Sequence, residues 1–225
     1  MRWVPYVLKS RRKTLSRGNE FAVQRGQVEF PEVVDLALLR SALLTQPVQA
    51  GSAGEARLRD KELVAASVLF PIVLREHGPT VLLTQRNDHL RDHPGQISFP
   101  GGRVEQSDLS PAHTALREAE EEIGLSPSRV EIIGFLPEYC TVTGYRITPV
   151  VGLLTPPFQL RPAPSEVAEV FEVPLSFLLN PANHERHSRE DSTGTRHFFA
   201  VSYGSHFIWG ATAGIIVTLA RALAI

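Results

Sequence analysis

The chain has 225 residues, of which 43% are hydrophobic, and this is ample for one packed domain plus an extension. Its net charge of −1 excludes a globally basic surface, so nucleic acid is not expected as a partner. The single cysteine, Cys140, excludes an internal disulfide framework and fits the reducing cytoplasm. No apolar run reaches the roughly 18 residues that a membrane-spanning helix needs, so no membrane segment is expected.

Residues 1–30 form a basic extension. Seven lysines and arginines precede residue 26, and Glu20 is the only acid among them. This composition favours a flexible tail or an upstream start codon over an organellar presequence. Residues 31–60 are predicted to hold a short helix and a linker, because apolar residues recur at helical spacing in residues 33–44 and residues 49–54 are small and polar. Residues 61–225 are predicted to form the main domain.

Two strands open this domain. Residues 63–74 are apolar and β-branched, residues 80–84 continue that pattern, and the turn signal His77-Gly78-Pro79 lies between them. A hairpin is therefore predicted. The polar residues 88–95 are typical of a loop, and a small basic patch accompanies them, made of Arg86, Arg91 and His93.

A helix is predicted to begin at Pro111. Ser110 suits the N-cap, proline is favoured at the first helical position, and Gly124 is a helix stop. The pattern then predicts, in chain order, a strand at 130–136, a turn-rich connection at 139–144, a strand at 147–154, a proline-rich loop at 156–164, a strand ending at Pro174 and a short helix at 175–179.

The last part of the chain begins with a polar stretch. Residues 180–196 are polar and predict a mobile excursion. Residues 197–203 and 206–209 predict a closing hairpin through Gly204-Ser205, and residues 211–223 predict a final helix. Because strands alternate with few helices, the order of elements indicates an α+β fold.

The helix after Pro111 carries a cluster of glutamates. At about 100° per residue, Glu118 and Glu122 lie roughly 40° apart and Glu121 roughly 60° to the other side, so three carboxylates project together. Like charges at this spacing destabilise a helix, so a compensating cation is expected. Mg²⁺ and Mn²⁺ prefer such oxygen ligands, whereas the alternative is a solvated acidic face. The loop Phe99-Pro100-Gly101-Gly102 favours the metal, because its glycines let the backbone approach a ligand.

Residues 117–125 resemble the second half of the Nudix hydrolase signature, Arg-Glu-apolar-any-Glu-Glu-any-Gly-apolar. In that family a Gly, five residues, a Glu and seven residues precede it. Here Asp108 follows Gly102 after five residues, and eight residues separate it from Arg117. The longer spacing and the aspartate are similar to the coenzyme A pyrophosphatase branch of the family. The role of Asp108 is left open.

That branch carries a second marker before the signature. It is matched here by Leu82-Leu83-Thr84, Arg86, Leu90-Arg91, His93, Gly95-Gln96 and Phe99-Pro100-Gly101-Gly102. Pro94 is a departure, since a small residue such as alanine is more usual there. The resemblance continues through Thr143-Gly144-Tyr145, Thr148-Pro149-Val150, Glu166-Val167, Phe171-Glu172-Val173-Pro174-Leu175 and Trp209-Gly210-Ala211-Thr212-Ala213, and covers about residues 60–225.

The resemblance implies a Nudix-type α/β/α sandwich with a mixed β-sheet and a loop-helix-loop catalytic motif. It also implies that Mg²⁺ or Mn²⁺ is held by carboxylates and a backbone carbonyl, and that an arginine orients one of those carboxylates. The implied metal ligands are Glu118, Glu121, Glu122 and Gly102, and the orienting residue is Arg117. For the general base, Glu121 and Glu166 stay open, with Glu169 as a weaker third candidate.

The implied substrate is a small nucleotide derivative, with neither nucleic acid nor a membrane as partner, and a homodimer is left open. Arg86, Arg91 and His93 are expected to hold its phosphates. Substrate contacts are also expected at Gln96, Gly101 and Phe99, although a core role is equally open for Phe99. The expected reaction splits coenzyme A, or its thioesters and oxidised forms, into 4′-phosphopantetheine and adenosine 3′,5′-bisphosphate. The alternatives are hydrolysis of ADP-ribose or a related nucleoside diphosphate derivative, and a non-catalytic nucleotide-binding protein.

Overall fold

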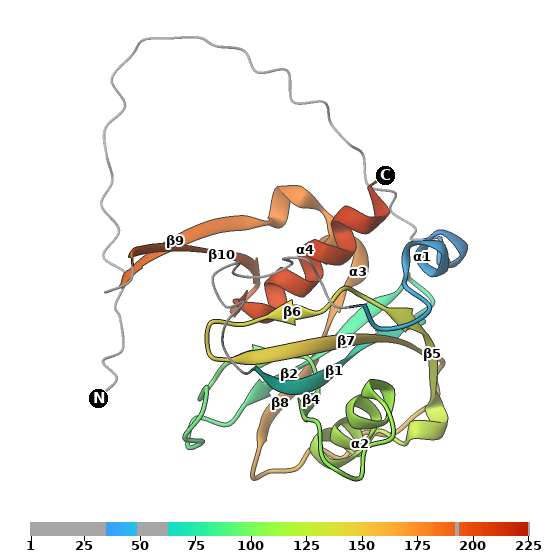
Figure 1. The fold of residues 1–225 in the computed structure, drawn as a ribbon. Coiled ribbons are helices and arrows are strands. Elements are labelled where there is room, and N and C mark those ends of the chain that lie inside the picture. Colours follow the sequence, from blue (N-terminus) through green and yellow to red (C-terminus); the bar gives the residue numbers. More distant parts are fainter. Residues whose placement is uncertain (1–34, 49–62, 192–193, 225) are drawn as a thin grey trace.

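The computed structural model describes residues 35–48, 63–191 and 194–224 (Figure 1). The predicted basic extension and the linker at 49–54 lie outside these residues. The short helix expected before the linker is present as α1 (Leu36–Ala42), and the Asp35 side chain caps it by accepting a hydrogen bond from the Ala37 amide at 2.8 Å. None of the described helices is long and apolar enough to cross a membrane.

The main sheet is mixed, as expected. β1 (Val64–Val73) and β7 (Tyr145–Leu154) run parallel over their whole length, whereas the other pairings are antiparallel. The predicted first hairpin is confirmed, since β1 pairs with β2 (Thr80–Arg86). The remaining strands of this sheet are β3 (Ile97–Ser98), β4 (Gly101–Arg103), β5 (Val130–Phe135), β6 (Tyr139–Cys140) and β8 (Val167–Pro174). The predicted turn at 139–144 thus begins with a two-residue strand.

Helices cover both faces of this sheet (Figure 1). Successive residues of a strand point to opposite faces, so Leu69 and Val73 pack with α2 (Pro111–Ile123), while Phe70 and Ile72 join the core beneath α4 (Ala211–Leu223). The short helix α3 (Leu175–Leu179) and α1 lie on the α4 side, together with a three-stranded sheet. Single turns of 3₁₀ helix occur at Pro127–Arg129 and Pro181–Asn183. The α/β/α sandwich is confirmed.

Helix α2 begins and ends where the sequence predicts. The Ser110 hydroxyl accepts a hydrogen bond from the His113 amide at 3.1 Å, and Pro111 occupies the first turn. Gly124 adopts φ 66°, a left-handed conformation that costs glycine little, and its amide donates to the Glu120 carbonyl at 2.9 Å. These local contacts fix the start and the end of the helix that carries the glutamates.

Residues 180–196, predicted to be a mobile excursion, contain regular structure over much of their length. The segment contains β9 (Glu185–Asp191) and the start of β10 (Gly194–Tyr203), which continue into β11 (His206–Trp209) as a second sheet. The charged composition of β9 does not predict a strand, because strand formation here depends on pairing with β10. The His187 ring stacks on Phe198 at 5.6 Å between centroids, and Ser202 donates to Glu185 at 2.7 Å.

Candidate active site

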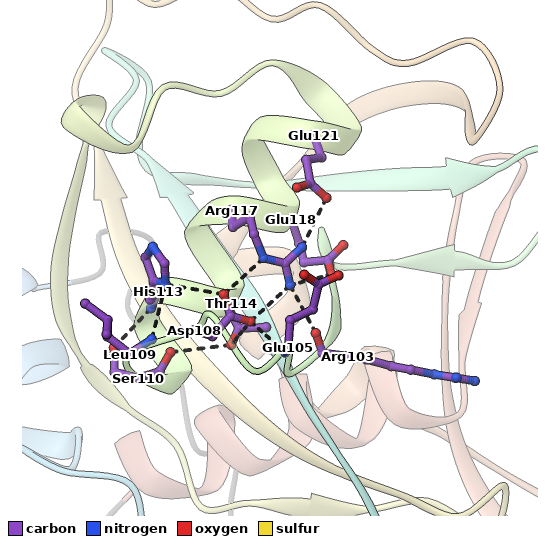
Figure 2. Close-up of polar contacts among 10 residues, drawn as sticks. All are labelled: Arg103, Glu105, Asp108, Leu109, Ser110, His113, Thr114, Arg117, Glu118 and Glu121. Atoms are coloured by element: carbon purple, nitrogen blue, oxygen red, sulfur yellow. Dashed lines mark hydrogen bonds and ion pairs between the residues drawn. The ribbon is translucent and has the colours of Figure 1, made fainter.

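Arg117 is the central side chain of the candidate site (Figure 2). Its Nη2 lies 3.0 Å from Glu118 Oε1 and its Nη1 donates to Glu121 Oε2 at 3.1 Å, so it braces two of the expected metal ligands. Nη2 also donates to the Arg103 carbonyl at 3.1 Å, which ties the helix to β4. The expected role of Arg117 as the partner of a helix carboxylate therefore has a geometric basis.

Asp108 is a partner of Arg117 that the sequence left without a role. Its carboxylate accepts from Arg117 Nε at 3.0 Å and Nη2 at 3.1 Å, from Thr114 Oγ1 at 2.9 Å and from the Glu105 amide at 2.9 Å (Figure 2). The Asp108 side chain is fully buried. The hydrogen bonds from Arg117 hold the pKa of Asp108 well below its usual range. Asp108 thus locks the loop before α2 against the arginine.

We expect Asp108→Asn to destabilise the protein by about 3 kcal/mol, because Arg117 would keep its charge and lose its buried partner. For a chain of this size the corresponding fall in Tm is roughly 10 °C, measurable by calorimetry. The carboxylate's pKa is depressed in the folded state, so its contribution is present at neutral pH and is lost only as pH falls into the acid range.

The matched control for this prediction is Glu131→Gln. It breaks the exposed ion pair between Arg40 and Glu131, whose closest atoms are 2.7 Å apart, and should cost less than about 1 kcal/mol. Equal losses in the two variants would contradict a locking role for Asp108.

Glu118 and Glu122 lie against the Gly101-Gly102 turn. The Gly101 amide donates to Glu122 Oε2 at 3.3 Å, and a Cβ added at Gly102 would overlap the Glu118 carboxylate. Glu122 is only 5% exposed, and burial raises its pKa to about 7. Burial also raises the pKa of Glu118, to which repulsion from Glu121 adds, and repulsion from Glu118 adds to the raised pKa of Glu122. Glycine is required at 102 because the carboxylate occupies the space beside it.

These two glutamates fit a hard divalent cation. A buried carboxylate with a raised pKa lacks compensating charge, and Mg²⁺ or Mn²⁺ would supply it. Glu121 stands apart, since 59% of its side chain is exposed and Arg117 holds it. In the part of the chain that the structure describes, no three acidic, histidine or cysteine side chains are gathered as a ready metal cage. The expected three-carboxylate cluster is therefore not preassembled while Arg117 engages Glu118 and Glu121.

Arg86 reaches this cluster from the end of β2. Its Nη1 lies 3.7 Å from Glu122 Oε1, and its side chain is 25% exposed. The arginine therefore stands at the edge of the carboxylates with donors free to turn toward an anion. Of the basic residues expected to bind phosphate, it is the one that the structure ties directly to the glutamates.

Glu166 approaches the same carboxylates from the loop before β8. After burial, which is the main cause, the charge of Glu166 makes a minor contribution to the raised pKa of Glu118 and of Glu122. Backbone hydrogen bonds hold its loop from two sides: Asn87 donates to the Glu166 carbonyl at 2.8 Å, and the Ala163 amide donates to the Glu122 carbonyl at 2.8 Å. The Asn87 side chain adds a bond to the Pro164 carbonyl at 2.7 Å. Asn87 is a positioning residue that sequence reasoning missed, because its partners lie almost eighty positions away.

Glu169, the third candidate base, is engaged elsewhere. Its Oε2 lies 3.2 Å from His206 Nε2, and the His206 ring stacks on Phe171 with 3.8 Å between centroids. His206 belongs to the second sheet, whereas Glu169 and Phe171 lie in β8, so this contact joins the two sheets. Glu169 is thereby less available for proton transfer than Glu166.

The loop that carries Arg91 and His93 projects into solvent. Both residues are exposed, and His93 adopts a left-handed φ of 57°. Asp92 in this loop makes a minor contribution, after Tyr145, to the raised pKa of Arg103 in β4. Arg91 and His93 follow Arg86 along the chain, and among the described residues the structure does not tie them to the glutamates.

Gln96 and Phe99 take different positions. The Gln96 side chain lies next to Gly210, at the start of α4. Phe99 is 3% exposed and packs on Phe70 with ring centroids 4.6 Å apart. Of the two roles left open for Phe99, the structure supports the core role, since the ring supports the Gly101-Gly102 turn from inside the protein.

Hard oxygen donors around a turn and a helix, with an arginine at their edge, define the class of divalent-metal hydrolases that act on phosphoric anhydrides. Comparison with known proteins narrows the class. The family model described as the NUDIX domain matches residues 64–191. The chain therefore belongs to the Nudix hydrolases, enzymes that act on pyrophosphate bonds and generally need divalent metal ions.

Two relatives that are 48% identical agree with this assignment. The chain is 48% identical over 158 residues to the uncharacterized Nudix hydrolase NudL of Escherichia coli (strain K12 / DH10B), which covers 69% of this chain and 80% of that protein. The same figures hold for the uncharacterized Nudix hydrolase NudL of Shigella boydii serotype 18. Among solved structures, a C. elegans Ap4A hydrolase binary complex aligns with a TM-score of 0.43 and 17% identity, over 49% of this chain and 80% of that chain.

Proposed function

We propose that this Nudix hydrolase splits the pyrophosphate bond of coenzyme A, or of its thioesters and oxidised forms. The products are adenosine 3′,5′-bisphosphate and 4′-phosphopantetheine or its acyl form. The observation that carries the proposal is the position of Arg86, 3.7 Å from Glu122 at the end of the strand that leads into the Arg91 and His93 loop. The proposed phosphate contacts therefore begin beside the carboxylates at Arg86 and continue in the loop of Arg91 and His93.

Phosphate contacts at Arg86 and in the loop of Arg91 and His93 suit a substrate that carries phosphate at two places. Coenzyme A carries a 3′-phosphate in addition to its pyrophosphate, so a selective site needs donors beyond those that hold the anhydride. In this proposal Arg86 holds the pyrophosphate, and the exposed Arg91 and His93 hold the more distant phosphate. ADP-ribose has no 3′-phosphate and would leave these outer donors without a partner.

The residues divide the chemistry between them. Glu118, Glu121, Glu122 and the Gly102 carbonyl would hold Mg²⁺ or Mn²⁺, which when bound neutralises charge on the phosphate oxygens and acidifies a water. Glu166 acts as the general base and removes a proton from the attacking water, because Glu169 is engaged by His206 and Glu121 by Arg117. Water adds to one phosphorus, the bridging P–O bond breaks, and the other phosphate leaves with the bridging oxygen.

Product analysis tests the proposal. Purified protein is incubated with coenzyme A and Mg²⁺ or Mn²⁺, and the products are separated by chromatography. Equal amounts of adenosine 3′,5′-bisphosphate and 4′-phosphopantetheine are expected, with no turnover after chelation of the metal. Absence of both products under conditions in which ADP-ribose is split would assign the enzyme to the alternative substrate.

A variant of the outer loop tests how the substrate is chosen. We expect Arg91→Ala to lower kcat/KM for coenzyme A by about tenfold, the value of one charge-assisted hydrogen bond, and to leave kcat/KM for dephospho-coenzyme A nearly unchanged. Steady-state kinetics on both substrates measures this. Arg129→Ala removes an equally exposed arginine at a turn after α2 and serves as the control. An unchanged preference in Arg91→Ala would show that this loop does not bind the 3′-phosphate.

A further inference from the structure

Ser67 is a buried side chain that the fold does not explain. It lies in the middle of β1 with no exposed surface, and among the described residues its Oγ is the one buried side-chain oxygen or nitrogen without a hydrogen-bond partner. A buried hydroxyl that has lost water and found no partner destabilises a protein, and such groups are rare. If packing were the only role of residue 67, alanine or valine would fill the position without the free-energy cost of a buried hydroxyl.

The strand register shows where this hydroxyl points. Ser67 is two residues from Leu69, which packs against α2, so its side chain also faces α2. In the antiparallel pairing of β1 with β4, Ser67 lies directly opposite Gly102, and facing residues project from the same side of a sheet. A Cβ at Gly102 would overlap the Glu118 carboxylate. The Ser67 hydroxyl is therefore buried on the side of the sheet where the Glu118 carboxylate lies.

Glu118 has a different partner in this structure. Its Oε1 lies 3.0 Å from Arg117 Nη2, and only 17% of its side chain is exposed. A carboxylate that turns toward a cation must loosen this contact, and its position must then be fixed by another donor. The unpartnered hydroxyl beside it can supply that donor.

We propose that Ser67 is a positioning residue for metal binding: its hydroxyl donates to the Glu118 carboxylate when Glu118 turns from Arg117 to the divalent cation. This inference rests on the proposed function, because it takes Glu118 as a metal ligand. The cost of the unpartnered hydroxyl falls on the metal-free protein and is relieved on binding.

Direct binding of Mn²⁺, measured by calorimetry without substrate, tests this role. Ser67→Ala should weaken Mn²⁺ affinity by about tenfold, the usual effect of losing a residue that holds a metal ligand. The Tm of the metal-free variant should be equal to that of the wild type or higher, because the unpartnered group is gone. Ser67→Cys, which keeps the volume and weakens the donor, should give an intermediate affinity and provides a second variant if alanine impairs folding.

Two further variants separate positioning from a structural effect. In a Glu118→Gln background, Ser67→Ala should change Mn²⁺ affinity less than twofold, because the hydroxyl acts through the glutamate. Thr212→Val removes a buried hydroxyl that does have a partner, the Ile97 carbonyl at 3.1 Å, and should lower Tm without changing Mn²⁺ affinity.

The possible results are distinct. Wild-type Mn²⁺ affinity in both Ser67 variants, a fall in metal-free Tm with Ser67→Ala like that of Thr212→Val, or an undiminished effect in the Glu118→Gln background would each overturn the role of Ser67. Failure of the wild type itself to bind Mn²⁺ would instead refute the metal site, and with it the proposed function.

Discussion

Replacing Glu122 with glutamine is expected to lower kcat/KM roughly 100-fold or more, because it removes a charge that the divalent cation needs. The same change should stabilise the metal-free protein at pH 8. Burial raises the pKa of Glu122 to about 7, so at pH 8 the folded metal-free protein carries a buried charge that water solvates in the unfolded state, and glutamine removes the cost of burying that charge. The resulting stabilisation by glutamine is on the order of 3 kcal/mol.

The pH dependence has a definite sign. A raised pKa in the folded state means that this stability is present below the unfolded value of about 4.5 and is lost as pH rises through about 7. The free energy of unfolding of the metal-free wild type should therefore fall between about pH 4.5 and about pH 7. In Glu122→Gln it should fall less over the same range. Denaturant unfolding at a series of pH values measures the difference.

Glu120→Gln is the matched control, since Glu120 lies on the same helix and is exposed. It should leave both activity and the pH profile near those of the wild type. A Glu122→Gln variant with near-normal activity at saturating Mg²⁺ would remove Glu122 from the metal site.

The second large effect is expected at Glu166. Glu166→Gln should lower kcat by roughly 100-fold or more, the usual contribution of a general base, while Mn²⁺ affinity stays within a few-fold of the wild type. The measurement is steady-state kinetics combined with calorimetric titration of Mn²⁺.

Glu169→Gln provides the comparison, since Glu169 lies on the same segment and is bound by His206. We expect a change in kcat of less than about threefold, because this carboxylate takes no proton in the reaction. If Glu169→Gln loses as much activity as Glu166→Gln, or if Glu166→Gln loses little, the assignment of the base is wrong.

The parts of the fold that follow from local rules could be predicted from sequence. Helix α2 begins and ends as expected because Ser110, Pro111 and Gly124 act within a few residues of themselves. The hairpin of β9 and β10 could not be predicted, because its charged strand is stabilised by contacts between His187 and Phe198 rather than by its own composition.

The same division applies to the candidate site. The spacing of the glutamates predicted which residues share the helix face, yet it could not show that Glu122 is buried and Glu121 exposed. The contact of Asp108 with Arg117 needs the loop to fold back on the helix. The position of Glu166 depends on β8 pairing with β2. Such contacts come from the tertiary fold, which one sequence does not display.

The most direct test of the account compares kcat/KM of the wild-type enzyme for coenzyme A and for ADP-ribose, at equal Mg²⁺ and pH. The metal site is common to both substrates. The ratio of the two kcat/KM values therefore reports the phosphate contacts proposed for Arg86, Arg91 and His93. The account predicts that coenzyme A is preferred by about tenfold or more, since one unmatched charged donor is worth at least that factor. A higher kcat/KM for ADP-ribose would contradict it.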